Sequence, residues 1–318
     1  MKTTELTQKS PLSGDLEGLK SYLLKRYSKS TFYTHLYLIK RFTNYYQERA
    51  QQAQYKDILN YIEYLRKHCD LHPKTLRHCL YAVKIYFNYL LETGKREDHP
   101  CSELLLKDKI NKQIQVDNLY SSDTLESFLH THQLHRNKHI EKRNEVIITL
   151  LIYQGLTVTE IAQLETKDID LEKCEIYIKG HHHQQSRTLP LQAKQILLFY
   201  NYLNEDRLQL LSYAKSPPSG ESKIGVSQLG GFFILSRYGK RINSHGISQM
   251  INENRPEGEK IQPIKIRQSV IANLLKKEND TRVVQVFAGH RRASTTVQYK
   301  QTELETLQSA VNQYHPLR

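Results

Sequence analysis

The sequence is poor in residues that tie a fold together through covalent bonds or metal ions. It has four cysteines, and no two of them show the Cys-x-x-Cys spacing of a zinc module. We therefore expect neither a zinc site nor a disulfide framework, and we expect reduced cysteines in a cytoplasmic protein. The four positions are Cys69, Cys79, Cys101 and Cys174. Tryptophan is absent altogether.

Long apolar runs are also missing. The first eighteen residues, MKTTELTQKSPLSGDLEG, are polar where a signal peptide would need an apolar segment. No stretch approaches the roughly 18 apolar residues that a membrane-spanning helix requires. Secretion and insertion into a membrane are therefore not expected.

What the sequence does have is positive charge and tyrosine. Its 318 residues carry 46 Lys+Arg against 33 Asp+Glu, a formal net charge of +13, and include 21 Tyr and 8 Phe. The length suits about two domains, and the aromatic side chains supply enough area to build their cores. Cations that neutralise phosphates gain affinity by releasing counterions, so this charge points to a nucleic-acid partner, but charge alone is equally compatible with a surface that is basic only for solubility.

The first hundred residues show apolar positions at helical spacing. Two helices are expected over residues 15–50, with a break at 28–31 and a capped start at Ser30. A third pattern covers 55–67, and a fourth runs from Thr75 to a stop signal at Gly94. These patterns predict a small all-helical domain over residues 13–98. The polar, weakly periodic segment 99–117 is predicted to be a linker.

A different pattern begins at residue 118 and defines a predicted second domain, 118–318. Helical runs at 123–130 and 143–154 precede an alternating stretch, 169–178, that is typical of strands. A hairpin is expected to return through 186–191, followed by an apolar helix at 193–203, a short strand in GFFILS (231–236), and helices to the end. The predicted fold class is mainly α with a small antiparallel β-sheet.

The most informative segment is PIKIRQSVIANLLKKENDTRVVQVFAGHRRASTTVQYK, residues 263–300. It resembles the C-terminal signature of the tyrosine recombinases, the phage integrase and Xer family. In that signature an Arg opens a helix, a Gly-His follows about twenty residues later, and a nucleophilic Tyr lies nine residues after the His. Arg267, Gly289-His290 and Tyr299 take those places. The blocks GLTVTE and EIYIKG…RTLPL also stand in family order, and the second places Lys179 on the hairpin.

The resemblance implies a fold and a chemistry. It implies a C-shaped clamp, in which a helical core-binding domain and the catalytic domain enclose duplex DNA, and cleavage through a 3′-phosphotyrosine. In that scheme Tyr299 is the nucleophile, Arg267 clamps the phosphate, Lys179 is the general acid and His290 donates a hydrogen bond to the phosphate. These assignments agree with physical chemistry, because a guanidinium pairs bidentately with phosphate and a Lys ammonium can protonate a leaving oxygen. No metal or cofactor is required.

Two positions depart from the family pattern. Thr157 stands where the first catalytic Arg is expected, and Ile264 stands where a His is expected three residues before Arg267. One hypothesis is an active recombinase in which another cation supplies the missing charge, with a hydroxyl donor from Thr157. The candidate cations are Arg291, Arg292, Lys265 and Arg187. The alternative is a degenerate member that binds DNA sites as a partner or regulator without cleaving them.

The expected partner is double-stranded DNA, bound by a homo- or hetero-tetramer assembled on two sites. An unrelated helical transcription factor is disfavoured, because no isolated helix-turn-helix is evident. Such a protein would also leave Lys179 on the predicted hairpin and Tyr299 near the C-terminal end unexplained. The candidate DNA contacts are Lys29, Lys74, Arg77, Lys84, Arg187, Arg291 and Arg292. The three histidines at 181–183 are expected near DNA phosphates rather than on a metal ion. The tail after Tyr299 is expected to form a helix that docks either on a neighbouring protomer or on its own domain.

Overall fold

The computed structural model describes residues 16–109, 114, 118–130, 137–181, 184–215, 231–253, 255–300 and 311. The chain divides into two compact units, residues 1–112 and 113–318, which we call the N-terminal unit and the C-terminal unit. The boundary falls inside the segment 99–117. None of the helices in the described ranges is long and apolar enough to cross a membrane.

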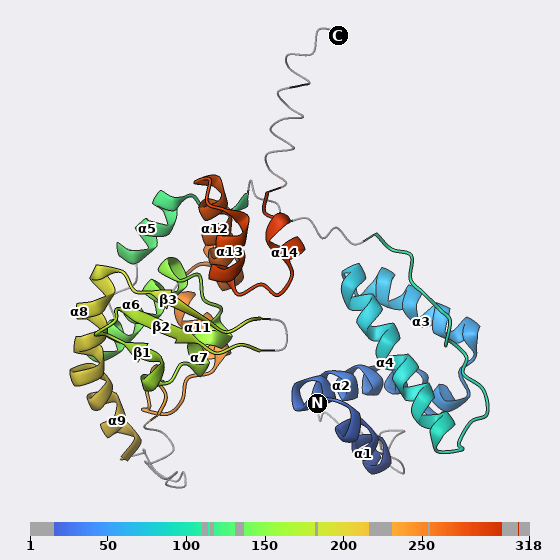
Figure 1. The fold of residues 1–318 in the computed structure, drawn as a ribbon. Coiled ribbons are helices and arrows are strands. Elements are labelled where there is room, and N and C mark those ends of the chain that lie inside the picture. Colours follow the sequence, from blue (N-terminus) through green and yellow to red (C-terminus); the bar gives the residue numbers. More distant parts are fainter. Residues whose placement is uncertain are drawn as a thin grey trace. The chain divides into compact units, whose positions relative to one another are not determined.

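The described part of the N-terminal unit is helical. Its helices are α1 (Leu16–Arg26), α2 (Lys29–Tyr46), α3 (Tyr55–His68) and α4 (Pro73–Glu92), with a 3-10 turn at Gln47–Gln52 (Figure 1). The capped start expected at Ser30 is displaced: α2 begins at Lys29, and the extended Ser28 occupies the N-cap position without a side-chain capping hydrogen bond. Helix α4 begins at a proline, and the ring of His72 accepts a hydrogen bond from the backbone N–H of Lys74.

Aromatic residues build the core of the N-terminal unit. The buried ring of Phe42 makes edge contacts with Tyr46, Tyr61, Tyr86 and Phe87, at centroid distances of 5.1–6.2 Å. Edge-to-face packing of this kind adds about 0.5–1.5 kcal/mol per pair beyond the area it buries. Tyr61 and Tyr86 are therefore core residues of this unit, whereas other tyrosines, such as Tyr33 and Tyr37, are exposed.

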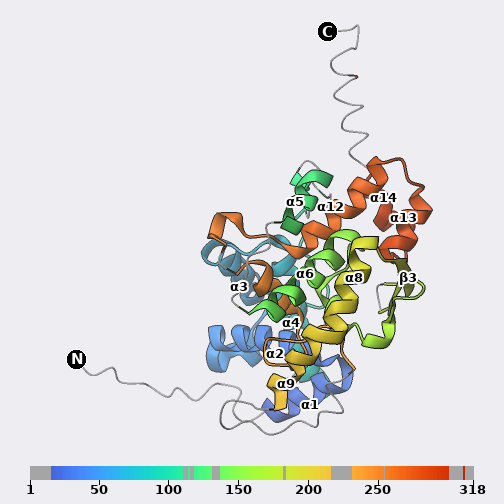
Figure 2. The ribbon, with the colours of Figure 1, turned by 90° about the vertical axis from the view of Figure 1, so that its left-hand side faces the viewer.

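The C-terminal unit combines further helices with one small sheet. Its α-helices are α5 (Ser122–His130), α6 (Lys138–Tyr153), α7 (Val158–Gln163), α8 (Ala193–Asn201), α9 (Arg207–Lys215), α11 (Ser244–Ile251), α12 (Pro263–Lys276), α13 (Thr281–Ala288) and α14 (Ala293–Val297). A π-turn at Tyr202–Asp206 joins α8 to α9, and short 3-10 turns lie at Thr166–Asp168 and Glu257–Glu259. Figure 2 shows this unit from the side, with α8 in front.

Three short strands, β1 (Ile169–Asp170), β2 (Glu175–Ile178) and β3 (Arg187–Pro190), form the antiparallel sheet in the order β1-β2-β3. Ile176 pairs with Leu189, and Ile178 pairs with Arg187. All four of these residues are buried, because alternate residues of a strand share one face. The register therefore turns the side chain of Arg187 into the protein. The predicted fold class, mainly α with a small antiparallel sheet, is confirmed.

The strand predicted in GFFILS is wrong. Phe232 and Leu235 form only isolated bridges, with Glu165 and Arg241. Phe233, Ile234 and Leu235 are all buried in succession, so the segment does not alternate as an edge strand would. The Tyr202 hydroxyl takes the place of a neighbouring strand, donating to the Phe233 carbonyl and accepting from the Leu235 N–H.

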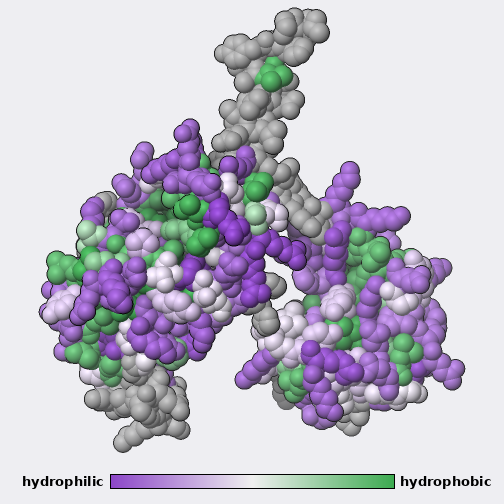
Figure 3. All heavy atoms as spheres, in the orientation of Figure 1, coloured by the Kyte–Doolittle hydropathy of each residue, from purple (hydrophilic) through white to green (hydrophobic). Residues whose placement is uncertain are grey.

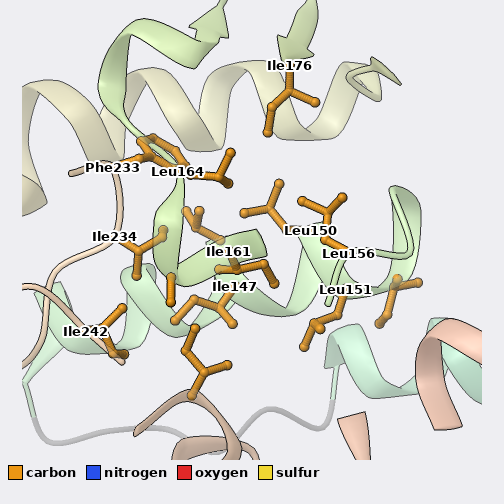
Figure 4. Close-up of a cluster of buried hydrophobic side chains, with 14 of the residues drawn as sticks. Ile147, Leu150, Leu151, Leu156, Ile161, Leu164, Ile176, Phe233, Ile234 and Ile242 are labelled. Carbon is orange, nitrogen blue, oxygen red and sulfur yellow. The ribbon is translucent and has the colours of Figure 1, made fainter. Parts of the chain in front are cut away.

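Helix α6 lies at the centre of the C-terminal core. Ile147, Leu150 and Leu151 of this helix meet apolar side chains from the sheet, from α7 and from the segment 233–242 (Figure 4). Helices α12, α13 and α14 pack together beside it, and α13 contacts β3. On the face shown in Figure 3, hydrophilic residues cover most of each unit and apolar ones form smaller patches. The packing of α13 on β3 brings the predicted site residues together.

Candidate active site

Arg267 is the anchor of the site. It lies in the second turn of α12 and its side chain is buried. Its Nη1 donates to the carbonyl of Gly155 at 2.7 Å, and its Nη2 donates to the carbonyl of Ala288. Burial lowers the pKa of this guanidinium, and the nearby Glu160 carboxylate opposes that shift. Arg267 is thus a fixed cation that joins the segment before α7 to the end of α13.

His290 and Tyr299 lie against each other. Their rings are nearly parallel, with an interplanar angle of 13° and centroids 6.2 Å apart. The His290 Nδ1 hydrogen-bonds the hydroxyl of Thr296 at 2.9 Å, which fixes the imidazole. Burial, then the charges of Arg267 and Arg187, lower the pKa of His290 to about 4, so this imidazole is neutral at neutral pH.

The Tyr299 hydroxyl belongs to a side chain that is only 8% exposed. Burial raises the pKa of this phenol, and the charge of Arg267 acts in the opposite direction. The phenol is therefore protonated in the free protein and becomes a nucleophile only as it loses that proton. The structure thus brings together Arg267, His290 and Tyr299, as the motif order predicted.

A buried acid that our sequence analysis did not single out completes the cluster. Glu160 Oε1 accepts from Arg187 Nη1 at 2.7 Å, and Glu160 Oε2 lies 3.7 Å from Arg267 Nη1. Burial acts to raise the pKa of Glu160, but Arg187 and then Arg267 hold it below its usual range. The sequence contained a signal for it: TVTE is a Thr-x-x-Glu capping box, and its Thr157 caps α7. Thr296, the partner of His290, was also missed.

The loop after α13 fits closely against Arg187. Gly289 has a left-handed φ of 66°, as expected of a residue that ends a helix. A Cβ at this position would lie 2.6 Å from Arg187 Nη1 and 3.0 Å from the Gln185 carbonyl. The Gln185 N–H also donates to the Gly289 carbonyl at 2.9 Å. The β2–β3 hairpin is therefore joined to the loop that carries His290.

Lys179 stands apart from the buried cluster. It directly follows β2 and its side chain is exposed. With Arg291, it lines an open hollow formed mainly by the hairpin. The other lining residues are Tyr177, Gly180, His181, Gln184, Gln185 and Ser186.

The two substituted positions differ in their surroundings. The Thr157 hydroxyl accepts from the Glu160 N–H at 3.2 Å, and both the hydroxyl and the backbone N–H of Thr157 donate to Glu160 Oε2. The hydroxyl and the backbone N–H of Thr157 are therefore both used within the capping box of α7. Ile264, in the first turn of α12, is 52% exposed and offers no polar group.

The candidate DNA contacts fall into three groups. Lys29, Lys74, Arg291 and Arg292 are exposed. Arg77 and Lys84 donate to the carbonyls of Asp108 and Ser102, and so hold the chain that follows α4. Arg187 is buried in the site and does not lie on the surface.

Some expectations fall on other parts of the chain. His182 and His183, and the tail residues Leu307 and Ala310, lie outside the described residues. Within the described ranges, no three His, Cys, Asp or Glu side chains form a group that could hold a metal ion. The four cysteines are free.

Family models account for most of the chain. The model of the phage integrase family matches residues 119–305, and the model of its N-terminal SAM-like domain matches residues 17–95. The chain belongs to the phage integrase family. Within this family, the tyrosine recombinase XerA of Pyrococcus furiosus is 26% identical over 314 residues, 96% of each chain. Tyrosine recombinase XerC of Anoxybacillus flavithermus is 23% identical over 299 residues, 92% of this chain and 93% of its own.

Solved structures of integrase-family proteins share the fold. XerH bound to its difH substrate in a pre-cleavage complex aligns with a TM-score of 0.64 at 17% identity, covering 97% of this chain and 99% of that one. The Tn1549 transposon integrase in complex with a circular intermediate DNA aligns with a TM-score of 0.59 at 16% identity, over 91% and 99% of the two chains. The predicted resemblance to tyrosine recombinases is confirmed.

Proposed function

We propose that this protein is a site-specific DNA recombinase that cleaves and rejoins DNA through a 3′-phosphotyrosine. One observation carries the proposal: Tyr299 is stacked on a neutral His290 beside the buried guanidinium of Arg267. A nucleophile, a hydrogen-bonding imidazole and a fixed cation are the groups that attack on a phosphodiester requires.

The chemistry follows from these groups. The Tyr299 oxygen attacks phosphorus and gives its proton to water as the O–P bond forms. The bond from phosphorus to the 5′ oxygen breaks at the same time, and that oxygen leaves with a proton from Lys179. Arg267 holds the non-bridging oxygens as charge builds on them. His290, oriented by Thr296, donates a hydrogen bond to the same phosphate. Attack by a 5′ hydroxyl on the phosphotyrosine reverses these steps, so the strands rejoin without ATP.

Lys179 is the proposed general acid. It delivers a proton to the leaving 5′ oxygen. Its exposed position after β2, on the same hollow as Arg291, suits a group that approaches its target only when DNA is bound. The proposed partner is double-stranded DNA, with four protomers assembled on two sites.

The degenerate alternative leaves the buried charges unexplained. A buried ion pair can often be replaced by apolar residues with no loss of stability, so stability alone is a weak reason for Arg187, Arg267 and Glu160 to lie together. A protein that only binds DNA needs surface cations. We therefore favour the active enzyme.

The test uses DNA from the ends of the encoding element, nicked near the presumed crossover. We expect the wild type to form an SDS-resistant complex with this DNA and Tyr299→Phe to form none, while both bind it equally in gel shifts. Tyr200→Phe is the matched control, because it removes the hydroxyl of an exposed tyrosine on α8. Specific binding without a covalent complex in the wild type would favour the degenerate alternative.

A further inference from the structure

Arg187 is a buried cation with unused hydrogen-bonding capacity. Its side chain is 2% exposed, and its Nη1 is bound to Glu160. Its Nε and Nη2 are also buried, and neither has a hydrogen-bond partner among the described residues. Leaving such donors unsatisfied costs about 1–3 kcal/mol each, and more for a charged group. A buried polar group without a partner therefore calls for an explanation, and a catalytic role or a bound ion is one.

The two unsatisfied nitrogens specify the shape of that acceptor. Nε and Nη2 lie on the same edge of the guanidinium plane, and their N–H groups point in parallel. This edge matches two oxygens on one atom, as in a phosphate or a carboxylate. Glu160 occupies the Nη1 side, so the Nε–Nη2 edge remains for a second anion.

The net charge of the cluster also favours a bound anion. Arg187 and Arg267 contribute two positive charges, Glu160 contributes one negative charge, and His290 is neutral. The cluster therefore carries an excess of one positive charge in a buried position. A phosphodiester carries one negative charge and would neutralise it.

Neighbouring residues hold Arg187 in this pose. The pairing of Arg187 with Ile178 turns its side chain inward, and Gly289 leaves room for its guanidinium. Glu160 is held in turn by the backbone and hydroxyl of Thr157. The Thr157 hydroxyl is thereby committed to Glu160, so it supports the cation instead of binding phosphate itself.

We propose that Arg187 is a second phosphate-binding arginine of the active site, that its Nε and Nη2 bind non-bridging oxygens of the scissile phosphate, and that Glu160 is its positioning residue. The proposal rests on the proposed function, because the phosphate is the one that Tyr299 attacks. The other candidate cations are less suited to this role. Arg291 and Arg292 are exposed, and the Lys265 ammonium lies over the ring of Tyr120, 4.4 Å from its centroid.

The decisive variant is Arg187→Lys. It keeps a positive charge beside Glu160, which protects the fold, but it lacks the paired Nε–Nη2 edge. We expect it to form the covalent complex on nicked DNA about 10²–10³-fold more slowly than the wild type, with little change in gel-shift affinity. The double variant Arg187→Gln/Glu160→Gln removes both charges together, so it leaves no unpaired buried charge. It should show the same defect in cleavage, and it tests the proposal even if Arg187→Lys fails to fold.

A second experiment does not depend on DNA cleavage. Inorganic phosphate added at constant ionic strength should raise the melting temperature of the wild type, because an anion that binds only the folded state stabilises it. The rise should be smaller in Arg187→Lys. Arg237→Gln, which removes an exposed arginine of the same unit, should behave as the wild type and so measures the general effect of phosphate on stability.

The outcomes separate this proposal from the proposed function. A wild type that binds DNA without cleaving it would refute the proposed recombinase function. The melting experiment with inorganic phosphate would still show whether Arg187 belongs to an anion-binding site. Cleavage by Arg187→Lys at the wild-type rate would overturn the catalytic role of Arg187 and leave the recombinase proposal standing. Equal stabilisation of both proteins by phosphate would overturn the anion site.

Discussion

Glu160 accepts hydrogen bonds from Arg187 through one oxygen and from Thr157 through the other. Because Arg187 and Arg267 lower the pKa of this carboxyl, it stays ionised well below neutral pH. The stability that it contributes is therefore present at neutral pH and is lost as the pH falls through its lowered pKa. One side chain thus supports both a helix end and an arginine of the site.

His290 should make the protein sensitive to mild acid. Its pKa is about 4 in the folded protein, against 6.5 for an unperturbed histidine, so between these values only the unfolded chain binds the proton. The free energy of unfolding should therefore fall as the pH falls through this window. From pH 7 to pH 5 this loss should be roughly 1–2 kcal/mol greater in the wild type than in His290→Gln. Urea unfolding followed by circular dichroism at both pH values measures the difference, and parallel losses would contradict it.

Gly289→Ala should abolish cleavage. The substitution forces alanine into a left-handed conformation, at about 1–2 kcal/mol, and places its Cβ where the Arg187 guanidinium lies. Gly94→Ala is the matched control, because Gly94 has the same φ, within a degree, and nothing within 4 Å of the added Cβ. Gly94→Ala should show the stability loss of the strained backbone alone in thermal melts, Gly289→Ala should show a larger loss because of the clash, and only Gly289→Ala should lose the covalent complex. An equally active Gly289→Ala would show that the close contact does not matter.

Helix α7 is the element that ties the fold to the site. It has only six residues, Val158–Gln163, and its N-terminus is held by the reciprocal bonds of Thr157 and Glu160. Short helices have little stability of their own, so a cap and tertiary contacts determine whether they form. Movement of α7 would move the carboxylate that positions Arg187.

Thr157→Ala should destabilise the protein by about 1 kcal/mol, as expected for the loss of an N-cap. It should also slow cleavage, because Glu160 loses the hydroxyl that holds its Oε2. Thr157→Ser should keep both properties. Thr159→Ala, at an exposed position of the same helix, should change neither. Urea unfolding and the covalent-complex assay measure the two effects, and normal cleavage by Thr157→Ala would show that α7 does not need its cap to position Glu160.

The helices and the grouping of Arg267, His290 and Tyr299 could be predicted from the sequence, because helical periodicity and motif spacing are local properties. The failure at GFFILS had a tertiary cause: the hydroxyl of Tyr202, about thirty residues earlier, replaces a strand partner. The buried position of Arg187 could not be predicted from the sequence either. It depends on the register of β3 against β2 and on a glycine about one hundred residues away. The sequence placed Arg187 among several candidate cations and gave no means of choosing between them.

At the scale of the whole molecule, positive charge is spread over both units. The net charge is +13, and exposed lysines and arginines occur in the N-terminal unit and near the active site. Such charge strengthens binding to DNA in a salt-dependent way. Individual phosphate contacts can therefore be counted from the salt dependence of the affinity.

Lys29→Ala and Lys74→Ala should each weaken DNA binding and reduce the slope of log K against log salt by about 1, since each is predicted to remove one phosphate contact. Lys194→Ala on α8 is the control and should leave the slope unchanged. Gel shifts at several salt concentrations measure the slopes. Unchanged slopes for both lysines would place the DNA on another face of the N-terminal unit.

Arg267 donates hydrogen bonds to carbonyls 112 and 21 residues before and after it in the chain. A site joined across such separations is complete only when the elements that carry it have packed together. During synthesis the N-terminal parts of a chain fold first, and Tyr299 follows every other residue of the cluster. The growing chain therefore lacks the proposed nucleophile until the residues that would position a phosphate have already been made.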